Sequence, residues 1–202
     1  MDLTIRMAKE EDADQVQAIY APFCALDSPV SFEIGAPGLE EIRRRIARTL
    51  EFYPWLVCER SGEVLGYVYA GPHNERAAYL WSVTTAIYIG RGQRRSGVGR
   101  ALYTSLFAVL RLQGFINAYA GIVLPNPASV GLHRAMGFEQ VGIYQGVGYK
   151  CGTWLDAAWW QLSIQERATN PPPPSGLGLV RGTSACEEAV ASGLSFLRQS
   201  SL

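Results

Sequence analysis

A stretch rich in glycine and arginine, residues 86–102, contains the side chains best suited to bind a charged ligand. It begins as an apolar, β-branched run typical of a buried strand, continues as a polar and glycine-rich turn, and ends as a helix. One side of that helix carries Leu102, Leu106, Val109 and Leu110. The first turn of a helix leaves N–H groups unpaired at a positive dipole end, and glycines let a phosphate approach them. Because arginines add charge and fork-shaped donors, the stretch predicts a pyrophosphate-binding loop.

Two familiar phosphate-binding patterns do not match this loop. It lacks the Gly-Lys-Ser/Thr ending of an ATP-binding P-loop. It also lacks the Gly-x-Gly-x-x-Gly of a dinucleotide fold, because Leu102 stands where the third glycine would be. Its segment Arg94-Arg95-Ser96-Gly97-Val98-Gly99 resembles the Arg/Gln-x-x-Gly-x-Gly/Ala coenzyme A signature of the GNAT acetyltransferase superfamily. Taken alone, this hexapeptide leaves open a glycine-rich strand-to-helix turn with solvated arginines.

The composition excludes several classes of protein. The chain has 202 residues, enough for one domain with a full core and a tail. Its formal charge of zero argues against binding to nucleic acid or membranes by electrostatics. Neither a secretory signal nor an apolar run of membrane-spanning length is visible. Because the four cysteines are scattered, we expect reduced, buried thiols in a cytoplasmic protein, with no metal site.

Hydrophobic periodicity predicts the elements around the loop. We expect strands over residues 3–7, 55–59, 64–70, 78–89, 118–123, 138–147 and 155–162. We expect amphipathic helices over 13–23 and 39–50, a central helix that stops at Gly114, and a short helix from Pro127 to a stop at Gly137.

The composition changes after Arg167. Four prolines at 171–174 favour an extended polyproline linker. Beyond them, Ser184-x-x-Glu187 could cap one weak helix that runs through Leu197. We therefore divide the chain into a domain over residues 1–167 and a Pro-rich linker and tail over 168–202, whose composition allows disorder.

A second motif adds to the resemblance to the GNAT superfamily. The segment Asn126-x-x-Ser129-x-x-x-His133-x-x-x-Gly137-Phe138 resembles a GNAT motif, with His133 where tyrosine is usual. The order of elements is also similar to that of a GNAT fold, an α/β (α+β) fold with a central mixed, mostly antiparallel sheet flanked by helices. Over about residues 3–162 the chain resembles the phosphinothricin N-acetyltransferase group, through pieces such as Tyr53-Pro54-Trp55-Leu56-Val57 and Gly148-Tyr149-Lys150-x-Gly152-x-Trp154-x-Asp156.

That resemblance implies a function and a cofactor. The group moves acetyl from acetyl-CoA, in a ternary complex, to the primary amine of a glutamate-like or methionine-like amino-acid analogue, and forms homodimers. The central strand edge is expected to pair with the pantetheine amides and to supply a backbone N–H to the oxyanion. Expected cofactor-binding residues are Ile87, Tyr88, Ile89, Arg94, Arg95, Ser96, Gly97, Val98, Gly99, Arg100, Asn126 and Ser129.

Two positions are candidates for the proton chemistry. An amine attacks only as the free base, so a route for proton removal helps. His133 sits where a tyrosine often protonates the departing thiolate, or it only hydrogen-bonds the cofactor or a neighbour. Relatives in the group carry a glutamate where this chain has Thr84, whose hydroxyl cannot act as a base near pH 7. Either Glu33, Glu75, Asp156, His133 or solvent assists, or the activity is lost or changed; we favour retained transfer because the coenzyme A loop is intact.

The acceptor site is less clearly indicated. Arg76 matches a loop arginine that faces the substrate acid in this group, but it could also be a solvated loop charge. Candidate pocket walls, which could equally be core, are Phe32, Tyr79, Thr85 and Tyr149. Three hypotheses remain: a small-molecule N-acetyltransferase, a peptide or protein N-acetyltransferase, and a non-catalytic acyl-CoA-binding module. The group-specific pieces favour the first.

Overall fold

The computed structural model describes residues 3–93 and 95–197. Its strands are β1 (Leu3–Met7), β2 (Trp55–Arg60), β3 (Glu63–Pro72), β4 (Ser82–Ile89), β5 (Asn117–Val123), β6 (Glu139–Lys150) and β7 (Thr153–Ser163). Its helices are α1 (Ala13–Cys24), α2 (Leu39–Leu50), α3 (Val98–Gln113), α4 (Pro127–Ala135), α5 (Leu177–Val180) and α6 (Ser184–Ala191). Short 3-10 turns are η1 (Glu10–Asp12), η2 (Ala77–Tyr79), η3 (Arg91–Gln93) and η4 (Leu194–Phe196). Among the helices in this part of the chain, none is both long and apolar enough to cross a bilayer.

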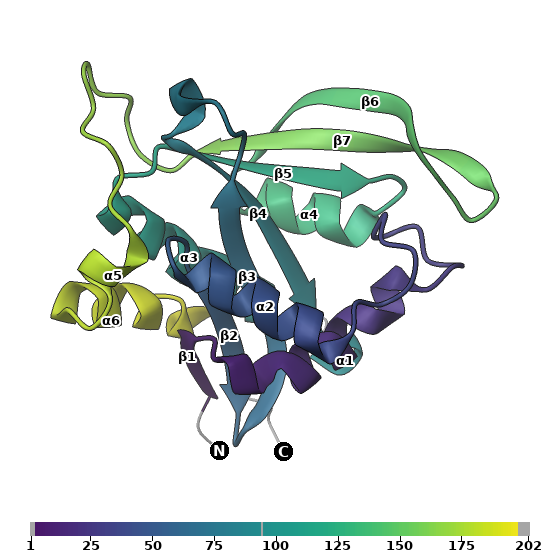
Figure 1. The fold of residues 1–202 in the computed structure, drawn as a ribbon, viewed down its shortest axis with the longest axis horizontal. Helices are drawn as coiled ribbons and strands as arrows, with labels where there is room; N and C mark the ends of the chain where they lie inside the picture. The colour runs from purple at the N-terminus through teal and green to yellow at the C-terminus, as the bar shows by residue number, and fades with distance from the viewer. Residues whose placement is uncertain (1–2, 94, 198–202) are drawn as a thin grey trace.

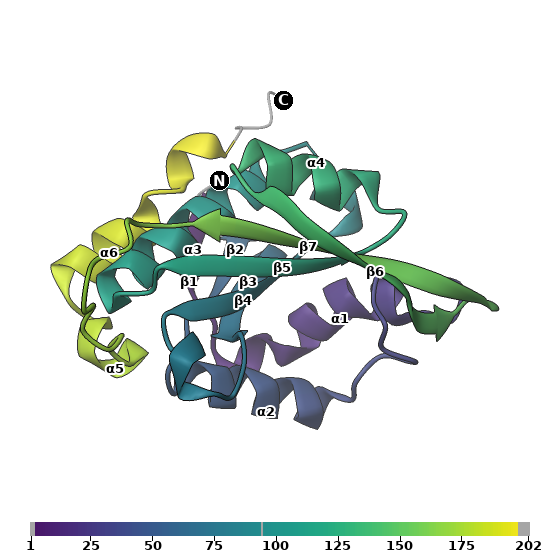
Figure 2. The same ribbon diagram turned by 90° about the horizontal axis from the view of Figure 1, so that it is seen from above.

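Within the described residues, seven strands form one sheet in the order β1-β2-β3-β4-β5-β7-β6 (Figure 1). Neighbouring strands are antiparallel, except that β4 and β5 run parallel. Seen from above, α1 and α2 cover one face, and α3, α4 and α6 lie on the other (Figure 2). The mixed, mostly antiparallel sheet flanked by helices is therefore confirmed.

Alternate residues of the same strand bury the two faces of the sheet. On β2, Trp55 and Val57 belong to the cluster that contains α1 and α2 residues. Leu56 and Cys58 belong to the larger cluster beneath α3. Because both faces are covered, residues 55–58 of this strand form an unbroken apolar run and do not alternate with polar residues.

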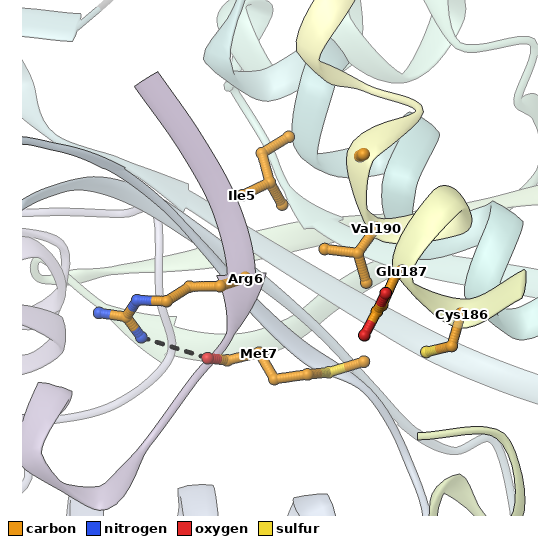
Figure 3. A pocket seen from close by; sticks show the side chains of 7 residues that line it. Ile5, Arg6, Met7, Cys186, Glu187 and Val190 are labelled. Carbon is orange, nitrogen blue, oxygen red and sulfur yellow. Dashed lines mark hydrogen bonds between the residues drawn. The ribbon is translucent and has the colours of Figure 1, made fainter. Parts of the chain in front are cut away.

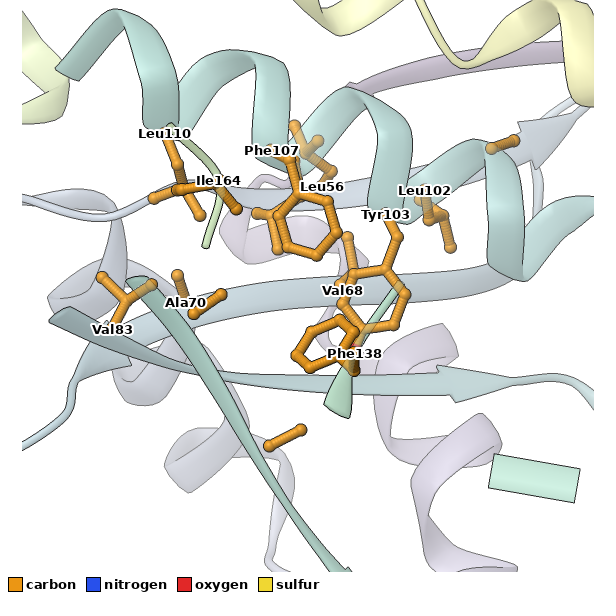
Figure 4. Packing of buried hydrophobic residues seen from close by; sticks show 14 of the residues in the cluster. Leu56, Val68, Ala70, Val83, Leu102, Tyr103, Phe107, Leu110, Phe138 and Ile164 are labelled. Atoms are coloured by element: carbon orange, nitrogen blue, oxygen red, sulfur yellow. The ribbon is translucent and has the colours of Figure 1, made fainter. Parts of the chain in front are cut away.

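The central helix α3 fills the larger cluster. Its residues Leu102, Tyr103 and Phe107 are buried and pack against Val68 of β3 and Phe138 (Figure 4). The helix starts after Gly97 and stops at Gly114, and both glycines adopt left-handed φ values, +90° and +92°. A left-handed glycine is a common way to end a helix, so the predicted stop at Gly114 is confirmed.

The strand predicted over residues 78–89 begins later than expected. Residues Ala77–Tyr79 form the turn η2 instead, in which the Tyr79 N–H donates to the Arg76 carbonyl and the Leu80 N–H to the Ala77 carbonyl. These local bonds compete with strand pairing, so β4 starts at Ser82.

The segment after Arg167, for which the composition allowed disorder, contacts α3 through α5, α6 and η4. Leu177 and Cys186 are buried in a cluster with Val109 of α3. The buried Ser105 hydroxyl donates to the Val190 carbonyl at 2.6 Å, and the Leu177 N–H donates to the Phe52 carbonyl at 3.0 Å. This packing has a physical reason, because α3 is apolar on the side away from the sheet too, and α5 and α6 cover it.

The helix α6 also reaches the first strand. Figure 3 shows Val190 and Cys186 of α6 opposite Ile5 and Met7 of β1, with a cavity of about 260 Å³ between them. Residues from the two ends of the chain therefore lie side by side on one face of the sheet.

Leu177→Ala tests whether this segment is part of the core. Removing a fully buried leucine side chain should lower the free energy of unfolding by about 2–4 kcal/mol. Leu179→Ala, in the same short helix but 77% exposed, is the matched control and should cost less than about 0.5 kcal/mol. Urea unfolding measures both variants, and equal stability of the two would contradict the packing of α5.

Candidate active site

The sheet opens between its two parallel strands. Among the described residues, β4 and β5 share three paired positions, which end with Thr84 opposite Tyr119. Beyond that pair the strands diverge (Figure 1), and a cavity of about 650 Å³ lies between them. Residues 85–89 of β4, the start of α3, residues 120–123 of β5, and α4 line it. Phe23 and Val30 border it from the side of α1, so the cavity reaches both faces of the sheet.

The predicted pyrophosphate loop forms one wall of this cavity. Gly97 caps α3 in a left-handed conformation, and its carbonyl accepts the first helical bond from Ala101 at 2.9 Å. The N–H groups of Val98, Gly99 and Arg100 therefore have no acceptor inside the helix and lie at its positive end. All three residues line the cavity, so the loop is built to receive an anion.

Other predicted loop residues differ in their placement. Arg95 lines the cavity and has a positive φ of 63°. The Ser96 hydroxyl donates to the Gln93 carbonyl at 2.6 Å, so it stabilises the turn. Arg94 lies outside the described residues.

The end of the described chain packs behind the same loop. A methyl group built on Gly97 would overlap the carbonyl oxygen of Phe196. The guanidinium of Arg100 lies over the Phe196 ring, 4.3 Å from its centroid, in a cation–π contact. The conformation of the loop therefore depends on a segment that the sequence analysis assigned to a tail.

The free edge of β4 forms a second wall. Residues Ile87, Tyr88 and Ile89 pair with β3 on one side and face the cavity on the other. The Tyr88 ring packs against Tyr20 with centroids 4.6 Å apart, so this side chain is part of the core near α1. What β4 offers to a ligand is its backbone, and an extended molecule with amide groups could pair with it.

Asn126 and Ser129 lie at the start of α4 and line the cavity. The Asn126 side chain accepts from the Ser129 N–H at 3.2 Å and so caps the helix. Both residues therefore have a structural function in addition to any contact with a cofactor.

His133 is buried, 2% exposed, at the cavity wall. Its Nδ1 lies 2.8 Å from the Ser129 carbonyl, which can only accept, so this nitrogen carries the proton. Its Nε2 then accepts from the Tyr103 hydroxyl at 2.8 Å. Burial lowers the pKa of His133, and the bond to the Ser129 backbone opposes that shift. As a neutral ring, His133 keeps its one proton on the Ser129 carbonyl and accepts from Tyr103 at Nε2, so it has no proton to pass through Tyr103 to a thiolate.

Tyr103 was missed by the sequence analysis. Its hydroxyl also lies 3.4 Å from Thr85 Oγ1, which donates to the Tyr119 carbonyl at 3.2 Å. Thr85, predicted as an acceptor wall, is thus buried in a network on the α3 side of the cavity. A tyrosine on the apolar face of a helix gave no signal beyond core packing, because its partners come from β4 and α4.

Thr84 lies at the opening and has a histidine partner. Its Oγ1 is 3.1 Å from Nδ1 of His73, a residue that the sequence analysis did not single out. The His73 ring contacts Tyr79, one of the predicted acceptor residues, with centroids 5.8 Å apart. The spacing of eleven residues could have suggested this pair only if the β3–β4 register had been known.

The other proposed bases have different partners. Glu33 forms an ion pair with Arg45 at 2.6 Å, and Asp156 accepts from the Gly146 N–H at 2.8 Å. Both carboxylates therefore stabilise local structure, whereas Glu75 lies in the exposed loop before η2.

The remaining predicted acceptor residues are dispersed. Phe32 packs so closely on Gly148 that a methyl group there would touch its ring, and Tyr149 is 59% exposed beside Trp154. Arg76 is exposed in the loop before η2. Phe32, from the segment between α1 and α2, therefore lies against the β6–β7 hairpin that carries Tyr149. Arg76 and Tyr79 are in the same part of the chain as His73.

Comparison with known proteins identifies the class of this fold and site. A family model described as an acetyltransferase (GNAT) domain matches residues 5–159, more than half of the chain. The chain therefore belongs to the GNAT acetyltransferase family, and it is an acetyl-CoA-dependent N-acetyltransferase. The resemblance and the fold predicted from the sequence are both confirmed.

Its relatives include enzymes for amino-acid analogues. The phosphinothricin N-acetyltransferase of Streptomyces viridochromogenes is 40% identical over 147 residues, 73% of this chain and 79% of the relative. The L-methionine sulfoximine/L-methionine sulfone acetyltransferase of Pseudomonas paraeruginosa is 37% identical over 126 residues, 62% of this chain and 73% of the relative. A solved phosphinothricin acetyltransferase from Sinorhizobium meliloti, in complex with AcCoA, has a TM-score of 0.79 and 34% identity, over 85% of this chain and 94% of that one.

The residues of this chain fit the cofactor of the family. The α3 N-terminus offers unpaired N–H groups for a pyrophosphate, and the free edge of β4 offers backbone groups for an extended amide arm. When bound, acetyl-CoA supplies an activated acetyl group as a thioester.

Gly97→Ala tests the cofactor loop. An L-residue in a left-handed conformation costs about 1–2 kcal/mol, and the added methyl group would also displace Phe196. We expect the Kd for acetyl-CoA, measured by isothermal titration calorimetry, to rise about tenfold or more. Gly92→Ala, where an added Cβ meets nothing within 4 Å, is the control, and equal Kd values for the two variants would contradict the loop assignment.

Proposed function

We propose that this chain acetylates the amine of a small amino-acid analogue of the phosphinothricin or methionine sulfoximine type, by direct transfer in a ternary complex. The cavity at the opening of the sheet carries the proposal, because it reaches both faces of the sheet. A cofactor seated against α3 and an amine from the side of α1 could meet there without a covalent enzyme intermediate. The phosphinothricin and methionine sulfoximine acetyltransferases among the relatives support the substrate class.

The cofactor residues have distinct functions in this proposal. Residues 94–100 hold the pyrophosphate, with Val98, Gly99 and Arg100 donating from the first turn of α3. The edge of β4 at Ile87 and Ile89 pairs with the pantetheine arm and supplies the N–H that stabilises negative charge on the carbonyl oxygen. Asn126 and Ser129 contact the same arm from α4. Tyr103 lines the cavity, and its hydroxyl donates to Nε2 of His133.

The acceptor lies beside β4 on the face that carries Thr84. Arg76 binds its carboxylate, because a guanidinium matches a carboxylate with two parallel donors. Tyr79 provides a wall near the amine, and Phe32 and Tyr149 remain further proposed walls. Thr85 remains a proposed wall only for the part of the cavity that faces α3.

An acceptor panel tests the proposed function. Purified protein with acetyl-CoA should release coenzyme A thiol with phosphinothricin, methionine sulfoximine or methionine sulfone. Arg76→Ala should raise the KM for the acceptor about tenfold, because the variant loses a charge-assisted hydrogen bond to the acceptor's carboxylate. The KM for acetyl-CoA should stay unchanged. Arg48→Ala, an exposed arginine of α2, is the control.

Other outcomes of the panel would replace the proposal. Acetylation of a mixed peptide library with no activity on free amino acids would favour a peptide N-acetyltransferase. Tight binding of acetyl-CoA without turnover of any amine would favour a non-catalytic acyl-CoA-binding protein.

We also propose that the chain forms a homodimer through β6. This strand is at the edge of the sheet, where unpaired backbone groups favour pairing with another chain. The β6–β7 hairpin also exposes large apolar side chains, which favour association: Val141, Ile143, Tyr144, Val147, Tyr149 and Trp154.

Light scattering after gel filtration tests the dimer. We expect wild-type protein at twice the chain mass, and the double variant Val141→Asp, Ile143→Asp at the chain mass, because buried charges without partners are costly. Leu179→Asp, at an exposed position of α5, is the control and should leave the mass unchanged. A monomeric wild-type protein would exclude the proposed dimer.

The cytoplasmic location stays a prediction. Burial raises the pKa of Cys58 to about 11 and raises the pKa of Cys24 and Cys186 as well. These three thiols are therefore protonated and suited to packing, which supports a protein that works in its reduced form.

A further inference from the structure

A histidine that has no role in the scheme above lies where the sheet opens. Nδ1 of His73 is 3.1 Å from Oγ1 of Thr84, and Thr84 forms the last parallel pair with Tyr119. The next residues on the two strands, Thr85 and Ala120, line the cavity. The His73 ring is therefore held one residue away from the opening, on the face of β4 that carries Thr84.

Aromatic rings from three elements hold the His73 imidazole in place. It stacks on Tyr119 of β5, with centroids 4.1 Å apart and 18° between the planes. Tyr79 of η2 and Trp159 of β7 meet it edge-on, with centroid distances of 5.8 and 5.9 Å. With these contacts and the bond to Thr84, the ring has a defined orientation, as a group that exchanges a proton with a bound substrate requires.

The two histidines of the chain differ in the hydrogen bonds that their ring nitrogens form. Both nitrogens of His133 are bonded, to Ser129 and Tyr103. For His73, no residue within 3–93 or 95–197 forms a hydrogen bond to Nε2. When Nδ1–H donates to the Thr84 hydroxyl, Nε2 presents a lone pair that can accept a proton.

The surroundings of His73 favour its neutral form. Burial lowers its pKa below the ordinary value of 6.5. The titratable side chains that η2 and β5 bring to the ring are the phenols of Tyr79 and Tyr119, and the preceding loop carries Glu75 and Arg76. Near pH 7 the lone pair on Nε2 is therefore available.

We propose, building on the proposed function, that His73 accepts the proton of the attacking amine and that Thr84 is a positioning residue that orients its ring. As the amine nitrogen bonds to the thioester carbonyl carbon, its proton passes to Nε2 of His73. The bond between that carbon and sulfur breaks, and coenzyme A leaves as a thiolate. The imidazolium then releases its proton to solvent and the thiolate takes one up, so the products are the amide and the free thiol.

His73→Gln tests the catalytic role, because glutamine keeps a polar side chain but accepts no proton. We expect kcat to fall about 100-fold, with the KM for acetyl-CoA within about twofold of wild type. Wild-type kcat should rise with pH through the pKa of His73, below 6.5, as the ring loses its proton, and His73→Gln should lack that rise. Glu75→Gln, in the same loop, should retain the rise of kcat with pH. If Glu75→Gln lacks that rise, the base is Glu75 and the proposal is overturned.

Variants of Thr84 test the positioning role. Thr84→Val keeps the shape but removes the hydroxyl, so kcat should fall about tenfold through misorientation of the ring, with the KM for acetyl-CoA unchanged. Thr84→Ser restores the hydroxyl and should recover most of that loss. If Thr84→Ser recovers nothing, the hydrogen bond to His73 has no catalytic function.

NMR supplies a readout that is independent of activity. Histidine-labelled, tag-free protein without coenzyme A should give two imidazole signals. The spectrum of His73→Gln assigns these signals and also reports whether that variant is folded. The His73 signal should titrate below pH 6.5 and shift when the acceptor amine is added. A His73 signal that ignores the amine, or a His73→Gln enzyme within about twofold of wild-type kcat, would overturn the proposal.

The two proposals can fail separately. The kinetic assay uses whichever amine is acetylated fastest, amino acid or peptide, so it remains valid if the amino-acid substrate class is wrong. Full activity of His73→Gln on a phosphinothricin-type amine would overturn the function of His73 alone.

Discussion

Hydrogen bonding between β4 and β5 stops after Thr84 and Tyr119, and the cavity depends on that separation. Each strand keeps a full partner on its other side, β3 for β4 and β7 for β5, so the sheet opens without losing its framework. The opening leaves backbone donors and acceptors of β4 facing the cavity, where a ligand with amide groups can satisfy them. It also places the N-terminus of α3, directly after β4, at the same cavity.

The helix α3 connects the core to the cofactor loop. Its sheet-facing side chains fill the main core, and its other side is covered by α5, α6 and η4. The same covering segment places Phe196 behind Gly97 and against Arg100. The chain's last described residues are thus in direct contact with the loop proposed to bind the pyrophosphate, and changes in this segment are expected to alter cofactor affinity.

Polar groups at the opening form two separate networks. On the α3 side, Thr85, Tyr103 and His133 are buried, the Tyr103 hydroxyl lies beside both of the others, and burial lowers the pKa of His133. On the other face, His73 bonds to Thr84 and has one nitrogen without a partner among the described residues. An attacking amine must lose a proton, which the second nitrogen of a neutral His73 could accept, whereas the one proton of a neutral His133 is bonded to the Ser129 carbonyl.

Local sequence determined much of the fold. The periodicity of residues 39–50, the glycines around 97–99 and the stop at Gly114 each encode conformation through near neighbours, and the helix α2 has the predicted bounds. Tertiary structure alone decided that residues 168–197 pack on α3, that β4 and β5 separate after Thr84, and that His73 meets Thr84. Those features depend on strand register and on surfaces far apart in the chain. Hydrophobic patterning reports which residues are buried, but contains no information about which distant surface buries them.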